Sequence, residues 1–505
     1  MPFERDEGEY AYAGQLIMQG IPPYELAYNM KLPGTYYMCA LGMTFFGQTI
    51  AGIHATLMVV NSLAVLFVFL LGRKLFGVTS GLVAASSYAF MSVSPIVYGM
   101  AAHANQFVVL FAVPATLLLW RGSAPARAHV VFFSGLLYGL AFLMKQQGVF
   151  FGAFGGFYLV YLGIKNRNLR GLFKDLVCYG LGIFAPFVCL CLVLLRAGVF
   201  SRFWFWTFTY AHSYVSMASW HLGFRWLYLH LESSVAYTTA LWFLAVLGLV
   251  LGATDRMFRE RTIFVAALWL FSFFGTATGL YFRGHYFILV LPAFCLLLGL
   301  AVVILETRFS WRMGVNLNHV IPSALFALAL GWSIYYQRDY FFRMPGDLIT
   351  QVIYANCPFI QTQMVSEYIR THCSPNDRIA VMGSEPQIYF YTQRHSATGF
   401  IYTYPLMELQ PNASYMQQQM ISEIESVHPK YMVWVSFPDS WLIRPTSDMT
   451  IIDWCSRYLK KDYDMVGVVK TSPNGLITYY WDEAVKDLHG SLGATFIAVY
   501  KSRGS

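Results

Sequence analysis

Long apolar stretches, separated by short polar loops, recur along the chain between Ala51 and Tyr336. A helix of about 20 apolar residues is long enough to cross a ~30 Å hydrocarbon core, and a helix satisfies its own backbone hydrogen bonds there. The pattern therefore predicts ten transmembrane helices. Their ranges are 51–72, 79–99, 104–120, 130–146, 149–163, 176–196, 236–253, 262–280, 285–305 and 320–337.

The pattern changes from Asp377 onward, where apolar runs shorten and polar residues intervene. Short alternating runs are typical of strands, and the stretches between them have helical spacing. We expect strands at 378–383, 431–437, 465–469, 476–481 and 494–500, with helices at 358–372, 413–427 and 450–460. The fold class predicted is a polytopic helical membrane protein of 51–340, preceded by an external loop of 1–50 and followed by an extramembrane α/β domain of 345–505.

Composition agrees with a membrane protein. Of 505 residues, 57% are hydrophobic and 12% are charged, and the mean hydropathy is +0.49, far from soluble globular proteins. The net charge of +8 comes from basic residues dispersed between apolar runs, so we expect no nucleic-acid partner. The eight cysteines lack metal-ligand spacing, although Cys357, Cys373 and Cys455 leave room for one disulfide.

Basic residues gather in the loops after the first, third, fifth, seventh and ninth predicted helices, which should therefore be cytoplasmic. The segment 1–50, the loop 197–235 and the C-terminal part then face the other side, which is periplasmic or lumenal. The compact loops and the absence of retention signals favour a bacterial inner membrane over an endoplasmic reticulum membrane. Because nothing in 1–50 would carry that segment across, we expect a further transmembrane helix upstream of Met1. The basic loop residues are Arg73, Lys74, Arg121, Arg127, Lys165, Arg167, Arg170, Lys174, Arg256, Arg259, Arg261, Arg308 and Arg312.

The loop 197–235 is dense in Trp, Phe and His residues. Such density is typical of an amphipathic segment in the membrane interface. Contact with a lipid tail or a sugar ring is the alternative reading.

The N-terminal segment crowds acidic residues next to the first predicted span, among them Asp6, Glu7 and Glu9, with Lys31 nearby. A solvated loop is one interpretation. The functional interpretation is that one carboxylate acts as a general base or holds a divalent ion, while Lys31 pairs with a phosphate.

A second set of ionisable residues lies at the outer ends of predicted helices, where charges are costly and often functional. Lys145 follows the apolar stretch LAFLM, and Arg283 with His285 marks the turn before the ninth helix. His103, with Asn105, holds the corresponding place before the third helix.

These residues resemble a known family. Arg5-Asp6-Glu7 with Tyr10, and Lys31-Leu-Pro-Gly34 with Tyr36, resemble the first external loop of GT-C glycosyltransferases in the family of dolichyl-phosphate-mannose protein mannosyltransferases and lipid A aminoarabinose transferases. The run Gly135 to Lys145 is similar to that family's helix ending in a basic residue, and Arg283-Gly-His-Tyr286 is similar to its R-x-x-Y turn. The segment HANQF lacks the Asp that many relatives carry, so no base is expected there.

The resemblance implies an inverting transferase that moves a sugar from a polyprenyl-phosphate donor to a lipid, glycan or protein acceptor. It implies that Asp6 is the catalytic base and that Glu7 assists it or binds a divalent metal. Lys31, Lys145 and Arg283 would bind the donor phosphate. The residues expected to contact substrate are Tyr10, Tyr36, His103, His285 and Tyr286.

Two other classes remain open. A transporter or flippase of lipid-linked substrates would also place charges inside a helical bundle, although we find no inverted repeat. A sensor would rely on its exported domain and tolerate Asp6→Asn. The sequence contains no G-x-G-x-x-G, Walker A, H-E-x-x-H or paired C-x-x-C motif.

Overall fold

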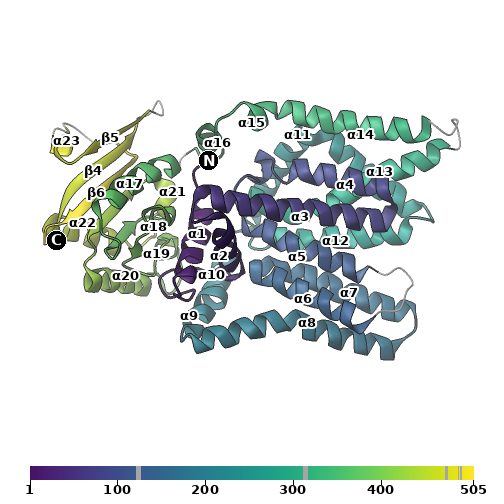
Figure 1. Cartoon of the computed structure of the whole chain (residues 1–505), viewed down its shortest axis with the longest axis horizontal. Helices are drawn as coiled ribbons and strands as arrows, with labels where there is room; N and C mark the ends of the chain where they lie inside the picture. The colour runs from purple at the N-terminus through teal and green to yellow at the C-terminus, as the bar shows by residue number, and fades with distance from the viewer. Residues whose placement is uncertain are drawn as a thin grey trace.

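A helical bundle and a smaller α/β unit lie end to end, with helices α1 (Arg5–Met18) and α2 (Gly34–Phe46) at their junction (Figure 1). The structure is a computed structural model. It describes residues 1–120, 127–310, 317–355, 357–472, 476–486, 488 and 492–504. The basic residues Arg121 and Arg312 lie outside these ranges.

Each predicted span overlaps a helix of the bundle. Six of the described helices are long and apolar enough to cross a membrane, which defines a multi-pass membrane protein, while the count of ten stays a prediction. The bundle contains α3 (Ile50–Phe76), α4 (Val78–Met91), α5 (Ala104–Leu119), α6 (Ala128–Met144), α7 (Val149–Lys165), α8 (Leu169–Arg196), α11 (Trp220–Thr254), α12 (Arg259–Ala277), α13 (Leu291–Ser310) and α14 (Leu317–Tyr336).

Three segments differ from the sequence prediction. The expected span 79–99 is wrong beyond Met91, where α4 ends and the short helix η1 (Pro95–Val97) follows. The expected loop 1–50 contains α1 and α2. Most of 197–235 is helical, because α11 begins at Trp220 and continues through a kink at Thr238. The preceding turns are α9 (Phe200–Trp204), the π-helix η3 (Phe205–Tyr210) and α10 (Ala211–Val215).

Small residues allow close helix packing in the bundle. A Cβ on Gly135 of α6 would lie 2.4 Å from the carbonyl oxygen of Tyr179, and one on Gly182 of α8 would lie 2.2 Å from that of Phe132. Neither position has room for a side chain. Such contacts bring backbones together where the hydrophobic effect alone does not drive association in lipid.

The α/β unit is built on one six-stranded sheet of order β2-β1-β3-β6-β4-β5. β1 is parallel to β2 and β3, and the other pairs are antiparallel. The five expected strands and three expected helices are confirmed within a few residues, while β2 was missed because only two of its residues pair. The strands are β1 (Arg378–Met382), β2 (His395–Ser396), β3 (Tyr431–Ser436), β4 (Tyr463–Thr471), β5 (Ile477–Trp481) and β6 (Phe496–Ser502).

All eight cysteines are free, so Cys357, Cys373 and Cys455 form no disulfide.

Helices surround this sheet and connect it to the bundle. The helices are α15 (Arg338–Phe342), α16 (Gly346–Ile353), α17 (Phe359–His372), α18 (Gln387–Thr392), α19 (Tyr404–Met407), α20 (Ala413–Val427), α21 (Pro438–Trp441), α22 (Thr450–Asp462) and α23 (Glu483–Lys486).

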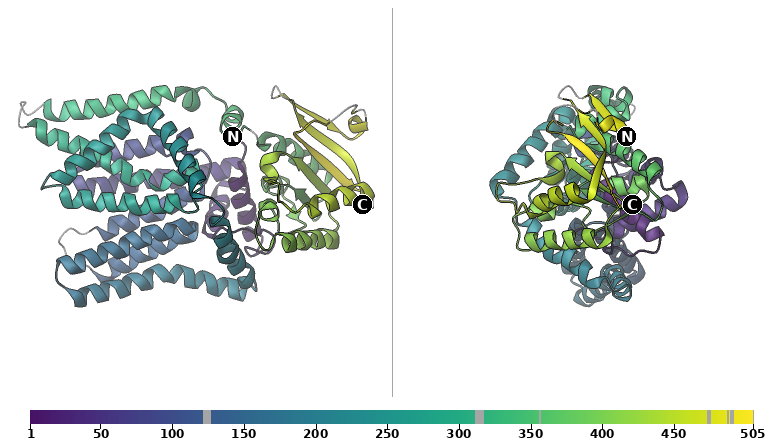
Figure 2. Two further views of the ribbon diagram at one scale, coloured as in Figure 1. Left: turned by 180° about the vertical axis from the view of Figure 1, so that it is seen from behind. Right: turned by 90° about the vertical axis from the view of Figure 1, so that its left-hand side faces the viewer.

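The N-terminal segment holds the α/β unit against the bundle, and the view from behind shows the N-terminus at the junction (Figure 2, left). A Cβ on Gly8 would lie 2.6 Å from that of Gln387, so α1 and α18 nearly touch. Arg5 forms a 2.6 Å ion pair with the fully buried Glu385 side chain. These contacts fix the α/β unit over the acidic face of α1.

Candidate active site

Helix α1 aims its carboxylates in different directions. Asp6 and Glu9 are three residues apart, which places them on one face of the helix. Lys31 lies between them, with its Nζ 2.7 Å from Asp6 Oδ1 and 2.5 Å from Glu9 Oε2. The segment between Gly20 and Lys31 leads the chain back over α1, so the cluster needs both segments.

The charge cluster keeps Asp6 ionised. Burial favours the protonated form of both carboxyl groups, and it raises the pKa of Glu9. For Asp6 the nearby Lys31 ammonium outweighs burial and holds the pKa well below its usual range. Tyr402 also donates a hydrogen bond to Asp6 Oδ1, at 3.2 Å.

Glu7 faces away from this cluster and has no exposed surface. Its Oε1 accepts hydrogen bonds from the backbone N–H of Ala102, at 2.7 Å, and contacts His54 Nε2, at 3.2 Å. With Glu4 it forms a capping box that begins α1. Glu7 does not line the cavity described below, so the contacts favour a structural role over the predicted catalytic or metal-binding one.

A polar cavity opens at the junction of the bundle and the α/β unit. It encloses about 1100 Å³ of space, part of it open to the outside. Residues far apart in the sequence meet there, and we call it the polar cavity. Its lining includes Asp6, Tyr28, Lys31, Lys145, Gln146, Trp206, Tyr210, Tyr214, Tyr281, Arg283, His285, Tyr286, Tyr402, Tyr404 and Glu408.

Two predicted cations reach this cavity from the bundle. Lys145 ends α6, where its Nζ donates to Asn105 Oδ1 at 2.9 Å and lies 4.2 Å from the ring centre of Tyr286. Burial lowers the pKa of Lys145 to about 7. Arg283 follows a turn in which Leu280 and Phe282 have positive φ, an uncommon conformation for such residues, and its side chain is exposed.

Of the expected substrate contacts, His285 and Tyr286 line the polar cavity, whereas Tyr10 and Tyr36 lie behind it. Tyr36 donates a hydrogen bond to Glu9 Oε1, and the Lys31 ammonium lies 4.6 Å from the ring centre of Tyr10. These two tyrosines position the charge cluster. The predicted phosphate ligand Lys31 is itself matched by two carboxylates, which favours the same positioning role.

His103 completes a group that could hold a metal ion. Its imidazole stacks on that of His285 with 4.2 Å between ring centres, and one ligand atom from each of Asp6, His103 and His285 lies within 4.8 Å of the others. His103 Nδ1 and Nε2 and His285 Nδ1 are buried without a hydrogen-bond partner among the described residues. Burial, opposed by Asp6, lowers the pKa of His103 to about 4, which leaves a neutral imidazole.

The surroundings oppose a cation at this group. Asp6 already pairs with Lys31, and the charges of Lys145 and Arg283 act on His285. A divalent ion would add positive charge next to three cations. Two imidazoles and a carboxylate are ligands that suit a transition metal. The positive charges around them disfavour binding of such an ion, so the reaction is argued without a metal.

The α/β unit supplies part of the polar cavity that the sequence did not indicate. Tyr402, Tyr404 and Glu408 line it from the chain around α19. Tyr210 of η3 donates a 2.5 Å hydrogen bond to Glu408 Oε2 across 198 positions of sequence. A pair so distant leaves no local pattern, although the aromatic density of 197–235 was a signal for Tyr210.

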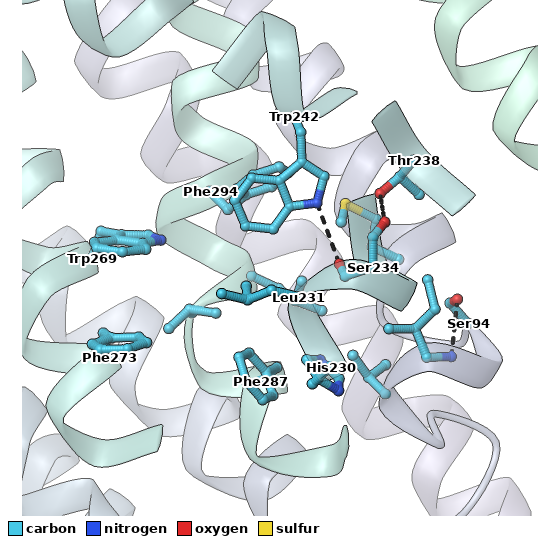
Figure 3. Close-up of a pocket in the computed structure, with 15 residues that line it drawn as sticks. Ser94, His230, Leu231, Ser234, Thr238, Trp242, Trp269, Phe273, Phe287 and Phe294 are labelled. Atoms are coloured by element: carbon cyan, nitrogen blue, oxygen red, sulfur yellow. Dashed lines mark hydrogen bonds between the residues drawn. The ribbon is translucent and has the colours of Figure 1, made fainter. Parts of the chain in front are cut away.

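An apolar cavity lies deeper in the bundle, between η1, α11, α12, η4 (Gly284–Leu289) and α13 (Figure 3). Trp242, Trp269, Phe273, Phe287 and Phe294 surround it, and Trp242 donates to Ser234 at 3.3 Å (Figure 3). A side groove adjoins both cavities. It shares Ile96 and His230 with the apolar cavity and Tyr281 and Arg283 with the polar cavity.

The sequence is similar to those of known glycosyltransferases. Residues 30–195 match the family described as dolichyl-phosphate-mannose-protein mannosyltransferase. The chain is 28% identical over 357 residues to an undecaprenyl phosphate-alpha-4-amino-4-deoxy-L-arabinose arabinosyl transferase of Pseudomonas aeruginosa, a match covering 66% of this chain and 61% of that protein. A protein of the same description from Pseudomonas paraeruginosa is 28% identical over 355 residues. The chain thus spans about three fifths of these curated relatives.

Solved structures share the fold. ArnT from Cupriavidus metallidurans bound to undecaprenyl phosphate has a TM-score of 0.55 at 15% identity, covering 88% of this chain and 90% of that one. The archaeal oligosaccharyltransferase AglB from Archaeoglobus fulgidus, in complex with an inhibitory peptide and a dolichol-phosphate, has a TM-score of 0.53 at 15% identity, covering 96% and 71%. The chain is thus similar in sequence to these glycosyltransferases and shares the fold of the solved ArnT and AglB structures.

Proposed function

We propose that the chain transfers a sugar from a polyprenyl-phosphate donor to an acceptor hydroxyl of a lipid, glycan or protein. The observation that carries this proposal is the meeting of Asp6, Lys31, Lys145 and Arg283, from four separate segments, in or beside one cavity. Glycosyl transfer from such a donor needs cations at the leaving phosphate and a base at the acceptor.

Lys145 and Arg283 bind the donor phosphate. As the bond between the anomeric carbon and the phosphate oxygen breaks, its electron pair leaves on the polyprenyl phosphate. The two cations stabilise that developing charge, which lowers the barrier because the site is already arranged around it. The polyprenyl phosphate is a sufficient leaving group, so no ATP is required.

Asp6 accepts the proton of the acceptor hydroxyl while the hydroxyl oxygen forms the new bond to the anomeric carbon. Direct displacement of this kind inverts the anomeric configuration. Lys31 keeps Asp6 ionised and, with Tyr402, fixes the direction of its carboxylate. Lys31 and Tyr402 are positioning residues in this scheme.

The apolar cavity accommodates part of the prenyl chain. Its lining is mainly aromatic and aliphatic, and the side groove connects it to Arg283. A donor with its phosphate at Arg283 can then extend its lipid along the side groove. The solved ArnT and AglB structures hold undecaprenyl phosphate and dolichol-phosphate, which supports a lipid of this class.

The site faces the non-cytoplasmic side in this proposal. Arg73 and Lys74 lie in the last turn of α3, whereas His54 near its beginning contacts Glu7 of α1, and Arg308 likewise lies in the last turn of α13. Basic residues collect at the cytoplasmic ends of membrane helices. The opposite end, with the polar cavity and the α/β unit, would then lie in the periplasm of a bacterial inner membrane.

The test is transfer of radiolabel from polyprenyl-phosphate sugars to a membrane extract by purified protein, with wild type compared with Asp6→Asn. Removing a general base lowers the rate by about 10²- to 10⁴-fold. Asp347→Asn, at an exposed position of α16, is the matched control and should transfer like wild type. Movement of the lipid without transfer, unchanged in Asp6→Asn, would favour the transporter alternative.

A further inference from the structure

One edge of the α/β unit faces the bundle, and its strands show which edge that is. β1 and β3 are parallel, so their carboxyl ends lie at the same edge of the sheet. Glu385, just after β1, pairs with Arg5 of α1. The backbone N–H of Ser384 donates to the carbonyl oxygen of Ser440, just after β3, at 3.1 Å. The carboxyl edge of the sheet therefore meets α1 at the junction with the bundle (Figure 1).

Two surface segments meet at this edge, one leading from α19 into α20 and the other leading from α21 into α22. Ser447 Oγ donates to the carbonyl oxygen of Met407 at 2.6 Å. Ser414 Oγ donates to Asp448 Oδ2 at 2.7 Å. These hydrogen bonds hold the two segments side by side, so their exposed side chains form one surface.

This surface exposes large apolar side chains. Leu409 is 72% exposed, Tyr415 is 70% exposed and Ile443 is 50% exposed. Single exposed apolar residues are common on proteins, whereas a group of them on adjoining segments indicates an interaction site. We call this group the apolar patch, and its members are Leu409, Tyr415, Leu442, Ile443 and Met449.

The apolar patch adjoins the aromatic segment of the bundle that precedes α11. Glu408, next to Leu409 in the chain, accepts a 2.5 Å hydrogen bond from Tyr210 of η3. Trp204 of α9 and Trp220, the first residue of α11, are both exposed. Exposed tryptophans near the ends of membrane helices are typical of the level of the lipid head groups. The apolar patch thus lies beside a segment that belongs at the membrane surface.

The charge of the two segments suits an anionic lipid surface. Residues 409–418 and 440–447 contain no acidic residue, and Arg444, their one charged side chain, is exposed. Asp448, which follows, has each carboxylate oxygen hydrogen-bonded to a hydroxyl group. Apolar side chains enter the head-group region of a bilayer, and basic side chains are attracted to its anionic lipids. The patch and Arg444 together therefore match a phospholipid surface.

We infer that the apolar patch docks on an anionic phospholipid surface and holds the mouth of the polar cavity at the level of the lipid head groups. Pro405 and Glu408 line that cavity and belong to the same segment as Leu409. The inference needs the bundle to lie in the membrane and the α/β unit to lie outside it. It does not depend on the transfer reaction.

The experiment places a photo-crosslinking residue on the apolar patch of the purified full chain in lipid nanodiscs. Ile443→p-benzoylphenylalanine should form phospholipid adducts on irradiation, which mass spectrometry measures. The matched control is Lys461→p-benzoylphenylalanine, at an exposed position roughly 20 Å away at the other end of α22. Its yield of lipid adducts should be at least about tenfold lower, the ratio that corresponds to burying one large apolar side chain.

The lipid composition tests the role of charge. The yield at Ile443 should rise when phosphatidylglycerol is added to nanodiscs of phosphatidylcholine. Arg444→Gln should lower the yield in the mixed nanodiscs by about fivefold, the effect expected of one basic residue at an anionic surface. Lys461→Gln should leave that yield unchanged.

Equal yields of lipid adducts at Ile443 and Lys461 would overturn the inference. Adducts at Ile443 that join the chain to a second copy, or to another protein when native membranes are irradiated, would overturn it in favour of a protein partner. Tyr415→p-benzoylphenylalanine replaces one aromatic ring with another, so it tests the same patch if the Ile443 variant fails to fold.

Discussion

The polar and apolar cavities are built by different means. The polar cavity collects single charged or aromatic side chains from segments that span residues 6 to 408, and it depends on how the α/β unit sits on the bundle. The apolar cavity is formed mainly by neighbouring helices between residues 230 and 294, through bulk and hydrophobicity. Under the proposed function, the polar cavity would perform the chemistry and the apolar cavity would hold the lipid.

Removing a cation from the polar cavity should have the largest effect on donor binding. Lys145→Gln should weaken donor binding by about 10- to 100-fold, because a hydrogen bond to a charged group contributes about 1.5–3 kcal/mol. Binding of labelled polyprenyl-phosphate sugar by purified protein measures this. Lys165→Gln, at the far end of α7, is the control and should bind the donor like wild type. Equal losses of donor affinity in both variants would show that Lys145 has no special role in the polar cavity.

The same lysine should make binding depend on pH. Since burial lowers its pKa to about 7, Lys145 is protonated below that pH and loses its charge above it. Donor affinity should therefore fall as pH rises through about 7. The total fall should be about tenfold, the lower end of the loss expected for Lys145→Gln. Lys145→Arg should bind independently of pH across this range. A wild-type affinity that is flat between pH 6 and 9 would contradict this role.

Glu7 should behave unlike Asp6. Glu7→Gln leaves a backbone N–H or His54 poorly paired in a buried place, so the free energy of unfolding should fall by about 1–3 kcal/mol. Transfer per folded molecule should remain within a few fold of wild type. Thermal unfolding and the transfer assay measure the two effects. A variant of normal stability that has lost transfer would restore the catalytic role for Glu7.

Filling the apolar cavity should affect long donors alone. Ser234→Phe should lower affinity for an undecaprenyl donor several-fold, since each buried CH₂ contributes about 0.8 kcal/mol, and leave a donor with two isoprene units unaffected. Leu328→Phe, on the exposed side of α14, is the control. Equal losses for both donors would show that the cavity does not hold the chain.

Removal of divalent metal should have the smallest effect. Because the Asp6, His103 and His285 group lies among cations, chelation should change transfer by less than about twofold. Dialysis against a chelator, followed by addition of Mn²⁺ or Zn²⁺, measures this. Loss of transfer that is restored by one metal would show that the ion overcomes those charges.

The sequence predicted most of the architecture because hydropathy and strand alternation are local properties. The apolar runs located the bundle helices, and the strands at 378–383 and 431–437 correspond to β1 and β3. Helix ends were less predictable. The apolar run after Met91 continues in sequence, yet its backbone leaves the helix, and α11 begins within a stretch rich in Trp and His.

The site was predictable only in part. Lys145 and Arg283 stood out because charges at the ends of apolar runs are costly, whereas Asp6 stood out through the crowded carboxylates and the family resemblance. The structure brings all three to one cavity. Glu7 adjoins Asp6 in sequence, and only the direction of each side chain from α1 separates their surroundings. Glu408 could not be predicted from the sequence, because Tyr210, which donates a hydrogen bond to it, lies 198 positions away.

The most direct test of the central claim is an experimental structure of the full chain with bound undecaprenyl phosphate. The division between the cavities predicts a phosphate within hydrogen-bond distance of Lys145 and Arg283, with the prenyl chain following the side groove towards Trp242 and Phe294. A phosphate bound away from both cations, or a chain that avoids the apolar cavity, would contradict the account.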